Sequence, residues 1–356
     1  MSDEILVGAL RLQSEVCREF GSPFNGAMLA HMAADLEAGG PVGELLTPWK
    51  GASRRKVFDE AAPIRLVNAF THLAAGDEVP ELSRAYPRDG RPGDPDAAWT
   101  VGRALIASQH GRLTAFMGHE PQTNEVRRSG VLLGGFLRVA AETGLPLRCF
   151  ELGASAGLNM LWDRFHYRLS QDDGGDAEWG DPAATVRVPI DWSGPAPPVD
   201  AKPQVVERAA CDRRPTDLTD AAQRQRLLAC IWPDQFDRLE RSRAAIALVA
   251  ELGLRVEAAD ALDWVRARVQ PQSGAATVLY HSIFWQYLPA ETREGLTAAI
   301  AEIGAQATEA APFAWLRMEP SPENLAVVEL RLTCWPGGED RLLAVVHPHG
   351  AWVRAS

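Results

Sequence analysis

The residues with the clearest potential for chemistry lie in one stretch, Leu147-Arg-Cys-Phe-Glu-Leu-Gly-Ala-Ser-Ala-Gly-Leu-Asn-Met-Leu161. A short apolar run contains Glu151, and it is followed by Gly153, by Gly157 and then by a helical pattern. A buried strand, a glycine turn and a helix N-terminus in this order let the backbone approach a ligand closely. The stretch therefore predicts a nucleoside-cofactor site of the S-adenosylmethionine (SAM) type, with Glu151 facing the ribose.

Acidic residues also follow two further predicted strands, and in an open α/β sheet ligands bind beyond the carboxyl ends of the strands. Asp212 ends one strand and would accept hydrogen bonds from both ribose hydroxyls. Asp260 ends another and would accept from the adenine amino group, while the Ala261 amide donates to a ring nitrogen. The predicted cofactor-binding residues are Glu151, Gly153, Ala154, Ser155, Gly157, Asn159, Asp212, Asp260, Ala261 and His281.

A fourth strand end supplies the candidates for catalysis. The predicted strand Thr277–Ile283 carries His281, which would face the methyl group and the substrate. Because a histidine titrates near neutral pH, His281 is the leading candidate for a general base. Tyr287 and Glu125 are catalytic candidates of lower rank.

Each of the three acids also has a structural explanation. Glu151 could cap the following helix, where negative charge is favoured. Asp212 could brace the Arg213-Arg214 turn, and Asp260 could be the N-cap of the next helix. Their joint occurrence at three strand ends favours the ligand site.

The glycine turn also fits a different reaction class. Gly153-Ala-Ser155-Ala-Gly157 matches G-x-S-x-G, the nucleophile elbow of α/β-hydrolases, with Ser155 as the nucleophile. The candidate base is His347 or His349. The candidate acid that would orient this base is Asp260 or Glu319. That fold places several strands before the elbow, however, whereas the region before Leu145 has helical patterns. A third alternative is a catalytically inactive protein that binds SAM or a nucleotide without turnover.

The spacing of His347 and His349 suits a metal ion, but no third ligand is near in the sequence. We therefore predict no metal site.

The elements that must position these residues change character near Leu145. Before it the apolar spacing is helical, and after it short apolar strands alternate with helices, which implies a mainly parallel sheet covered by helices. Val327–Thr333 and Arg341–Val346 predict a final hairpin. The predicted fold is α/β, with a class I methyltransferase-like (Rossmann-like), mainly parallel sheet, a C-terminal antiparallel hairpin and an all-helical N-terminal domain.

A chain of 356 residues exceeds the usual size of a single core. We predict a helical domain over residues 1–122 and an α/β domain over residues 123–356. A surface excursion is expected at about 165–204, with Tyr167-Arg-Leu169 paired to Thr185-Val-Arg-Val188. The cleft between the two domains is expected to hold a small-molecule substrate.

Composition narrows the class of protein. The formal charge of −11 argues against a sequence-independent nucleic-acid binder. The 5 scattered cysteines form no C-x-x-C pair, as expected for reduced thiols in a cytosolic protein. A signal-peptide pattern is missing, and no apolar run approaches the ~20 residues that span a membrane. We expect a cytoplasmic protein without nucleic-acid or membrane partners; the oligomeric state is not predicted.

Seven motifs spread along the chain resemble those of a known family. They are Ser22-Pro-Phe24, Gln122-Thr-Asn-Glu-Val126, Phe150-Glu-Leu-Gly-Ala-Ser-Ala-Gly-Leu-Asn159, Trp179-Gly-Asp-Pro182, Ile231-Trp-Pro-Asp-Gln235, Trp335-Pro-Gly-Gly338 and His347-Pro-His-Gly350. In this combination the sequence is similar to the bacterial domain-of-unknown-function family 2332 (DUF2332) over nearly its whole length. The resemblance implies a fold near that of the SAM-dependent methyltransferases and adds no substrate.

Overall fold

A computed structural model describes residues 2–76, 78–122, 124–171 and 174–356. The chain divides into a helical unit, Met1–Thr123 with Asp220–Arg243, and an α/β unit, Asn124–Thr219 with Ala244–Ser356. The first observed boundary lies beside the predicted one at residue 122. Residues 220–243 belong to the helical unit, although the sequence assigns them to the α/β domain.

The helical unit is held together by one apolar core that includes Met28, Leu66 and Phe70. Its helices are α1 (Ser2–Glu19), α2 (Pro23–Glu37), α3 (Val42–Leu45), η1 (Thr47–Trp49), α4 (Arg54–Asp59), α5 (Ala62–Ala75), α6 (Pro80–Ala85), α7 (Pro95–Met117), α9 (Ala221–Ala229) and the first half of α10 (Phe236–Glu251). Cys230 and Trp232 are part of the same buried cluster. Burial of apolar side chains, worth about 1.5–3 kcal/mol each, therefore explains why residues 220–243 join this unit.

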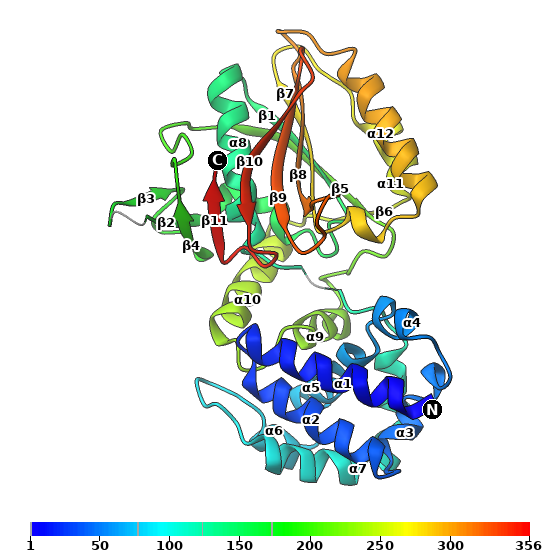
Figure 1. The fold of residues 1–356 in the computed structure, drawn as a ribbon. Coiled ribbons are helices and arrows are strands. Elements are labelled where there is room, and N and C mark those ends of the chain that lie inside the picture. The colour runs from blue at the N-terminus through cyan, green and yellow to red at the C-terminus, as the bar shows by residue number, and fades with distance from the viewer. Residues whose placement is uncertain (1, 77, 123, 172–173) are drawn as a thin grey trace. The chain divides into compact units, whose positions relative to one another are not determined.

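The α/β unit is built on one 11-stranded sheet with the order β3-β2-β4-β11-β10-β9-β8-β7-β1-β5-β6 (Figure 1). The strands are β1 (Leu147–Leu152), β2 (His166–Gln171), β3 (Asp176–Trp179), β4 (Arg187–Ser193), β5 (Val205–Asp212), β6 (Glu257–Ala258), β7 (Ala276–Ser282), β8 (Phe313–Pro320), β9 (Val328–Trp335), β10 (Glu339–Val346) and β11 (Trp352–Ala355). Strands β6, β5, β1, β7 and β8 are parallel, so their carboxyl ends lie at one edge. Strand β10 ends at the same edge because β9 is antiparallel to both of its neighbours.

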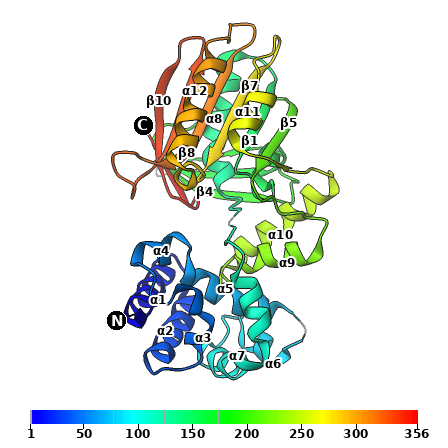
Figure 2. The same cartoon turned by 90° about the vertical axis from the view of Figure 1, so that its right-hand side faces the viewer.

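Helices cover both faces of this sheet. Helix α8 (Arg128–Thr143) packs against one face, and α11 (Ala261–Arg268) and α12 (Ala290–Gly304) lie on the other (Figures 1 and 2). Gly130 and Gly135 allow α8 to approach the strands closely, since an added Cβ would overlap Ile190 or Leu316. This layering positions the residues that follow the strands.

The predicted mixed α/β fold with a large, mostly parallel sheet is confirmed, and so is the terminal hairpin, which is β9 with β10. The predicted pairing within residues 165–204 is present, with Tyr167 opposite Val188, but the prediction that this segment is a surface excursion is wrong. Strand β2 pairs in parallel with β4, and β4 pairs with β11, so this segment extends the main sheet. Residues 172–173 of the segment lie outside the described part of the chain. Strand β11, which the sequence pattern did not reveal, makes the connection possible.

The 5 cysteines are free, and all except the partly buried Cys334 are buried. Burial raises the pKa of the Cys149 thiol to about 12, so this group stays protonated and unreactive. In the part of the chain that the structure describes, no helix combines the length and apolar character that crossing a membrane requires.

Candidate functional site

The candidate site lies where the strand order reverses. From β6 through β5 to β1, each neighbouring strand comes earlier in the sequence. On the other side of β1, the neighbours β7 and β8 come later in the sequence. This reversal, between β1 and β7, is the position at which open α/β sheets bind ligands beyond the carboxyl ends of their strands. The residues after β1, β5, β6 and β7 were predicted to act together, and the sheet brings these strand ends to a common edge.

The turn after β1 is tightly folded through three left-handed residues. Gly153, Ser155 and Gly157 have φ angles of 64°, 54° and 75°, and the Ala154 amide donates to the Cys211 carbonyl at 3.1 Å. Ser155 is buried, with 7% of its surface exposed. A left-handed serine is uncommon and marks a turn whose shape the surrounding structure imposes.

The segment that follows this turn is a 3-10 helix, η2 (Leu158–Arg164), with a kink at Leu161. The helix predicted after the glycine turn is therefore present as a 3-10 helix and not as an α-helix. The Leu158 amide, the first donor of η2, bonds to the Asn124 side-chain oxygen at 3.0 Å. A short 3-10 helix whose first amide is already bonded gives an anion little of the attraction that an α-helix N-terminus offers.

Asp212, at the end of β5, holds the turn in place. One carboxylate oxygen accepts from the Ser155 amide at 2.9 Å, and the other accepts from the Arg214 amide at 2.8 Å. The bracing role considered for the Arg213-Arg214 turn is thus present. Each oxygen retains a lone pair, so the same carboxylate can still accept from a hydroxyl group of a ligand.

Asp260 is the N-cap of α11, as its alternative explanation predicted. A single oxygen, Oδ1, accepts from the Leu262 and Asp263 amides at 2.9 and 3.3 Å. Asp260 is exposed, and Oδ2 takes no part in the cap. The Ala259 amide donates to the Asp212 backbone carbonyl at 3.1 Å, which keeps the two acidic strand ends side by side.

Glu151 lies away from the edge, on the face of the sheet that α8 covers. It is level with Tyr280 in the β1–β7 ladder and accepts a hydrogen bond from the Tyr280 hydroxyl at 3.2 Å. Burial, with a further contribution from the Asp212 charge, raises the pKa of Glu151 to about 8. A buried, protonated carboxyl group is unsuited to the ribose role predicted for it, and we leave Glu151 out of the proposed cofactor site.

His281 is fully buried on the opposite face of the sheet, with both ring nitrogens bonded. Its Nε2 accepts from the Trp315 indole N–H at 3.1 Å, so the proton is on Nδ1, which donates to Glu319 at 2.6 Å. His281 stacks on Trp285 with ring centroids 5.3 Å apart. In this arrangement His281 offers no free lone pair for a general base, and it supports the aromatic side chains around it.

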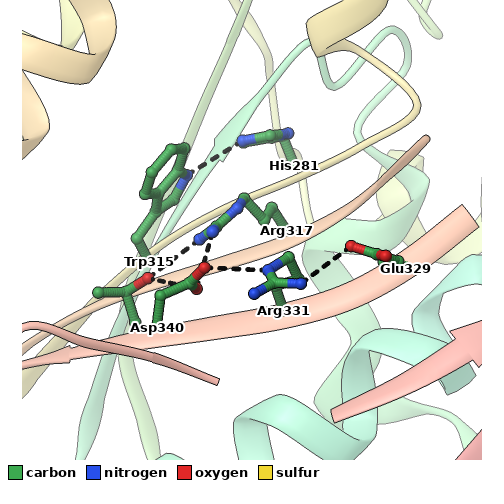
Figure 3. A network of polar contacts seen from close by, with 7 residues as sticks. His281, Trp315, Arg317, Glu329, Arg331 and Asp340 are labelled. Carbon is green, nitrogen blue, oxygen red and sulfur yellow. Dashed lines mark hydrogen bonds and ion pairs between the residues drawn. The ribbon is translucent and has the colours of Figure 1, made fainter. Parts of the chain in front are cut away.

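A polar network beside Trp315 continues across β8, β9 and β10 (Figure 3). The Arg317 guanidinium lies 4.1 Å from the centre of the Trp315 ring and donates to Asp340 at 2.7 Å. Asp340 also accepts from Arg331 at 2.9 Å, and Arg331 donates to Glu329 at 3.0 Å. These contacts hold the Trp315 ring in place, and with it the His281 tautomer.

Phe284 covers the glycine at the end of β1. A Cβ added at Gly153 would overlap the Phe284 ring. The space directly over the turn after β1 is therefore occupied by this side chain. The carboxylates at the ends of β5 and β6 lie outside that contact, whereas a ligand that extends over Gly153 would require Phe284 to move.

Gly153→Ala should lower the free energy of unfolding by about 2–4 kcal/mol, through the left-handed backbone and the overlap with Phe284. In a Phe284→Ala background the overlap disappears, so the same substitution should cost only about 1–2 kcal/mol. Urea unfolding of the two single variants and the double variant measures this difference. An equal cost of Gly153→Ala in both backgrounds would contradict the contact.

The remaining predicted residues occupy different places. The Asn159 side-chain amide donates to the Glu125 carbonyl at 3.2 Å, which joins the start of η2 to the segment before α8. Glu125 is buried and accepts from the Arg127 amide at 3.0 Å. Tyr287 lies in η3 (Trp285–Tyr287) and is 74% exposed. The structure therefore gathers Asp212, Asp260, the glycine turn and Ala261, the first residue of α11, at one edge. It buries Glu151 and His281 on the two faces of the sheet and places Tyr287 in η3.

The serine-hydrolase constellation is not assembled. Glu319 bonds to His281, and Asp260 caps α11, so neither acid orients His347 or His349. β1 is the first strand in the described part of the chain, whereas a nucleophile elbow follows several strands.

The imidazole ring of His347 accepts a hydrogen bond from the His349 amide at 3.0 Å. Burial and the charge of Arg127 lower the pKa of His347. A group of side chains able to hold a metal ion is not found among the described residues.

Comparison with models of protein families assigns nearly the whole chain to one family. The family model described as "Uncharacterized protein conserved in bacteria (DUF2332)" matches residues 8–355. The chain belongs to the DUF2332 family. Neither the curated proteins nor the solved structures gave a match. Membership of DUF2332 brings no assigned activity, so the geometry of the site must support any function.

Two DUF2332 motifs meet in the helical unit and have a structural role there. In Ser22-Pro-Phe24, the Ser22 hydroxyl and the Phe24 amide donate to the Asp234 carboxylate at 2.5 and 2.9 Å. The neighbouring Gln235 donates from its side-chain amide nitrogen to the Phe20 carbonyl at 2.9 Å. Residues of the Ile231–Gln235 motif thus fix the start of α2, which was not evident from sequence because the partners are so far apart in the chain.

Three other DUF2332 motifs meet in the α/β unit. Asn124, from the Gln122–Val126 motif, accepts from Leu158 of the Phe150–Asn159 motif. The Arg128 guanidinium donates to the Pro348 carbonyl of the His347–Gly350 motif at 3.0 Å. Thr123 of the first motif lies outside the described residues. The first of these contacts supports the turn after β1, and the second joins the start of α8 to the loop after β10.

Proposed function

We propose that the α/β unit binds SAM at the carboxyl ends of β1, β5 and β6, and that the protein is a SAM-dependent methyltransferase acting on a small molecule. The observation that carries the proposal is the pair Asp212 and Asp260 on adjacent strand ends beside the reversal of strand order. Two carboxylates with unused acceptor capacity suit the hydroxyl and amino donors of adenosine.

Each residue has a defined role in this proposal. Asp212 accepts from the ribose hydroxyls, and its bonds to the Ser155 and Arg214 amides fix its orientation in advance. Asp260 accepts from the adenine amino group through Oδ2, while Oδ1 keeps its bonds to α11. The bound cofactor supplies an electrophilic methyl group. The chain contributes positioning, which accounts for most of the acceleration in such transfers.

Asp260→Asn should weaken binding of S-adenosylhomocysteine (SAH) about tenfold or more. Asparagine keeps a cap oxygen for α11, so the fold is preserved, but its NH2 group cannot accept from the adenine amino group. Isothermal titration calorimetry with SAM, SAH and adenosine measures the change. Asp94→Asn is the matched control, because Asp94 caps α7 through the same two kinds of bond.

Unchanged SAH affinity in Asp260→Asn would remove adenine recognition from the proposal, and no binding of SAM, SAH or adenosine at millimolar concentration would remove the proposal altogether. Binding of SAM without methyl transfer in a broad metabolite screen would instead favour the inactive cofactor-binding protein.

A further inference from the structure

The turn after β7 carries unusual backbone strain. Ile283 has a φ angle of 50°, in the left-handed region. For a β-branched residue this is a genuine outlier, and such strain persists only where surrounding contacts impose it. The strained residue directly precedes Phe284, the side chain that covers Gly153.

One carboxylate accepts from both backbone amides that follow Ile283. Glu319, on β8, accepts from the Phe284 amide at 2.9 Å and from the Trp285 amide at 3.2 Å, and it also accepts from His281. The Ile283 amide still continues the β7–β8 backbone ladder by donating to the Met318 carbonyl at 2.9 Å, and beyond it this carboxylate of the neighbouring strand holds the next two amides. Phe284 itself is only partly buried, at the margin of the apolar cluster on this face of the sheet, and its ring also contacts His281 with the centroids 5.7 Å apart.

The position of the ring matters because Gly153 is at the reversal of strand order, where the sheet would receive a ligand. The acids at the ends of β5 and β6 are available to adenosine while Phe284 remains in place. A ligand that extends from adenosine across Gly153 meets the ring. The geometry therefore separates two classes of ligand, those that end at the ribose and those that carry an extension.

We propose that residues 283–285 form a plug over Gly153, which the amino-acid end of a SAM-type cofactor displaces when it binds. This inference rests on the proposed function, because it assumes that adenosine binds at Asp212 and Asp260. Opening the plug releases the strain at Ile283 but gives up the Phe284 contact and the bonds to Glu319. A ligand that requires the open state binds more weakly, in proportion to the fraction of molecules that are open.

The test compares SAH, which has the amino-acid end, with adenosine, which lacks it. Calorimetry on the full-length Phe284→Ala variant should show SAH affinity raised by about tenfold, with adenosine affinity changed by less than about twofold. Phe284→Leu, which keeps an apolar side chain and guards against a folding defect, should shift SAH affinity in the same direction by less. Phe58→Ala, at a partly buried phenylalanine of the helical unit, is the matched control and should leave both affinities unchanged.

The outcomes separate the two proposals. SAH affinity that is unchanged or lowered in both Phe284 variants, while adenosine and SAH still bind, overturns the plug and leaves the proposed function standing. An equal gain for adenosine and SAH also overturns the plug, because it shows a general effect on the site. Failure of both ligands to bind any variant overturns the plug together with the proposed function.

Discussion

At pH 9 the Glu151→Gln variant should be more stable than the wild-type protein by on the order of 4 kcal/mol. Burial raises the pKa of Glu151 from 4.5 to about 8 in the folded protein, so the folded state binds the proton more tightly than the unfolded chain does. The contribution of Glu151 to the free energy of unfolding of the wild-type protein is fully present below pH 4.5, and it is lost as the pH rises through 8. Glutamine stays neutral and can still accept from Tyr280, so the advantage of the variant should shrink toward zero as the pH falls to 4.5.

Urea unfolding of both proteins at several pH values between 4.5 and 9 measures the difference directly. Glu339→Gln, at an exposed position at the start of β10, is the control for the loss of one carboxylate from the sheet. A stability difference for Glu151→Gln that does not change with pH would show that Glu151 ionises normally. Glu151 would then again be a candidate for binding a ligand at the carboxyl ends of the strands.

Glu319→Ala should lower the free energy of unfolding by on the order of 3–5 kcal/mol. The substitution removes the acceptor for His281 Nδ1 and for the Phe284 and Trp285 amides, and leaves these donors unpaired. His281 is fully buried, so water cannot replace the lost bond without disturbing the core. Equilibrium unfolding in urea gives the free energy, and the imidazole nitrogen shifts in NMR spectra report the tautomer of His281.

Glu329→Ala is the matched control for this change. Glu329 is level with Glu319 in the β8–β9 ladder, but the Phe284 and Trp285 amides donate to Glu319 and not to Glu329. Glu329 accepts from Arg331, which keeps Asp340 as a partner. The control should therefore cost only about 1 kcal/mol. Equal costs for the two variants would mean that Glu319 does not hold the turn after β7.

The sequence predicts the strand ends well because their signal is local. Apolar runs followed by Asp212, Asp260 and the glycine turn can be recognised within a few residues, and the parallel sheet then brings them to one edge. The face on which a side chain lies depends on register with a distant strand. Glu151 faces α8 because β1 and β7 pair it with Tyr280, and no pattern near Glu151 indicates that pairing.

Long-range contacts also explain the other differences. The turn after β1 continues into a 3-10 helix whose first amide bonds to Asn124. Residues 220–243 join the helical unit through Asp234, which pairs with Ser22. The side chain that covers Gly153 comes from the end of β7, so the sequence around the glycine shows an open turn where the structure has a contact. Spacing alone cannot reveal such partners.

The proposed cofactor site is tested most directly by a crystal structure of the full-length protein soaked with millimolar SAH. We expect density for the adenosine group at the carboxyl ends of β5 and β6, with the ribose hydroxyls within hydrogen-bonding distance of Asp212 and the adenine amino group within reach of Asp260. Density at another place, or a well-diffracting crystal with no SAH density at that edge, would contradict it.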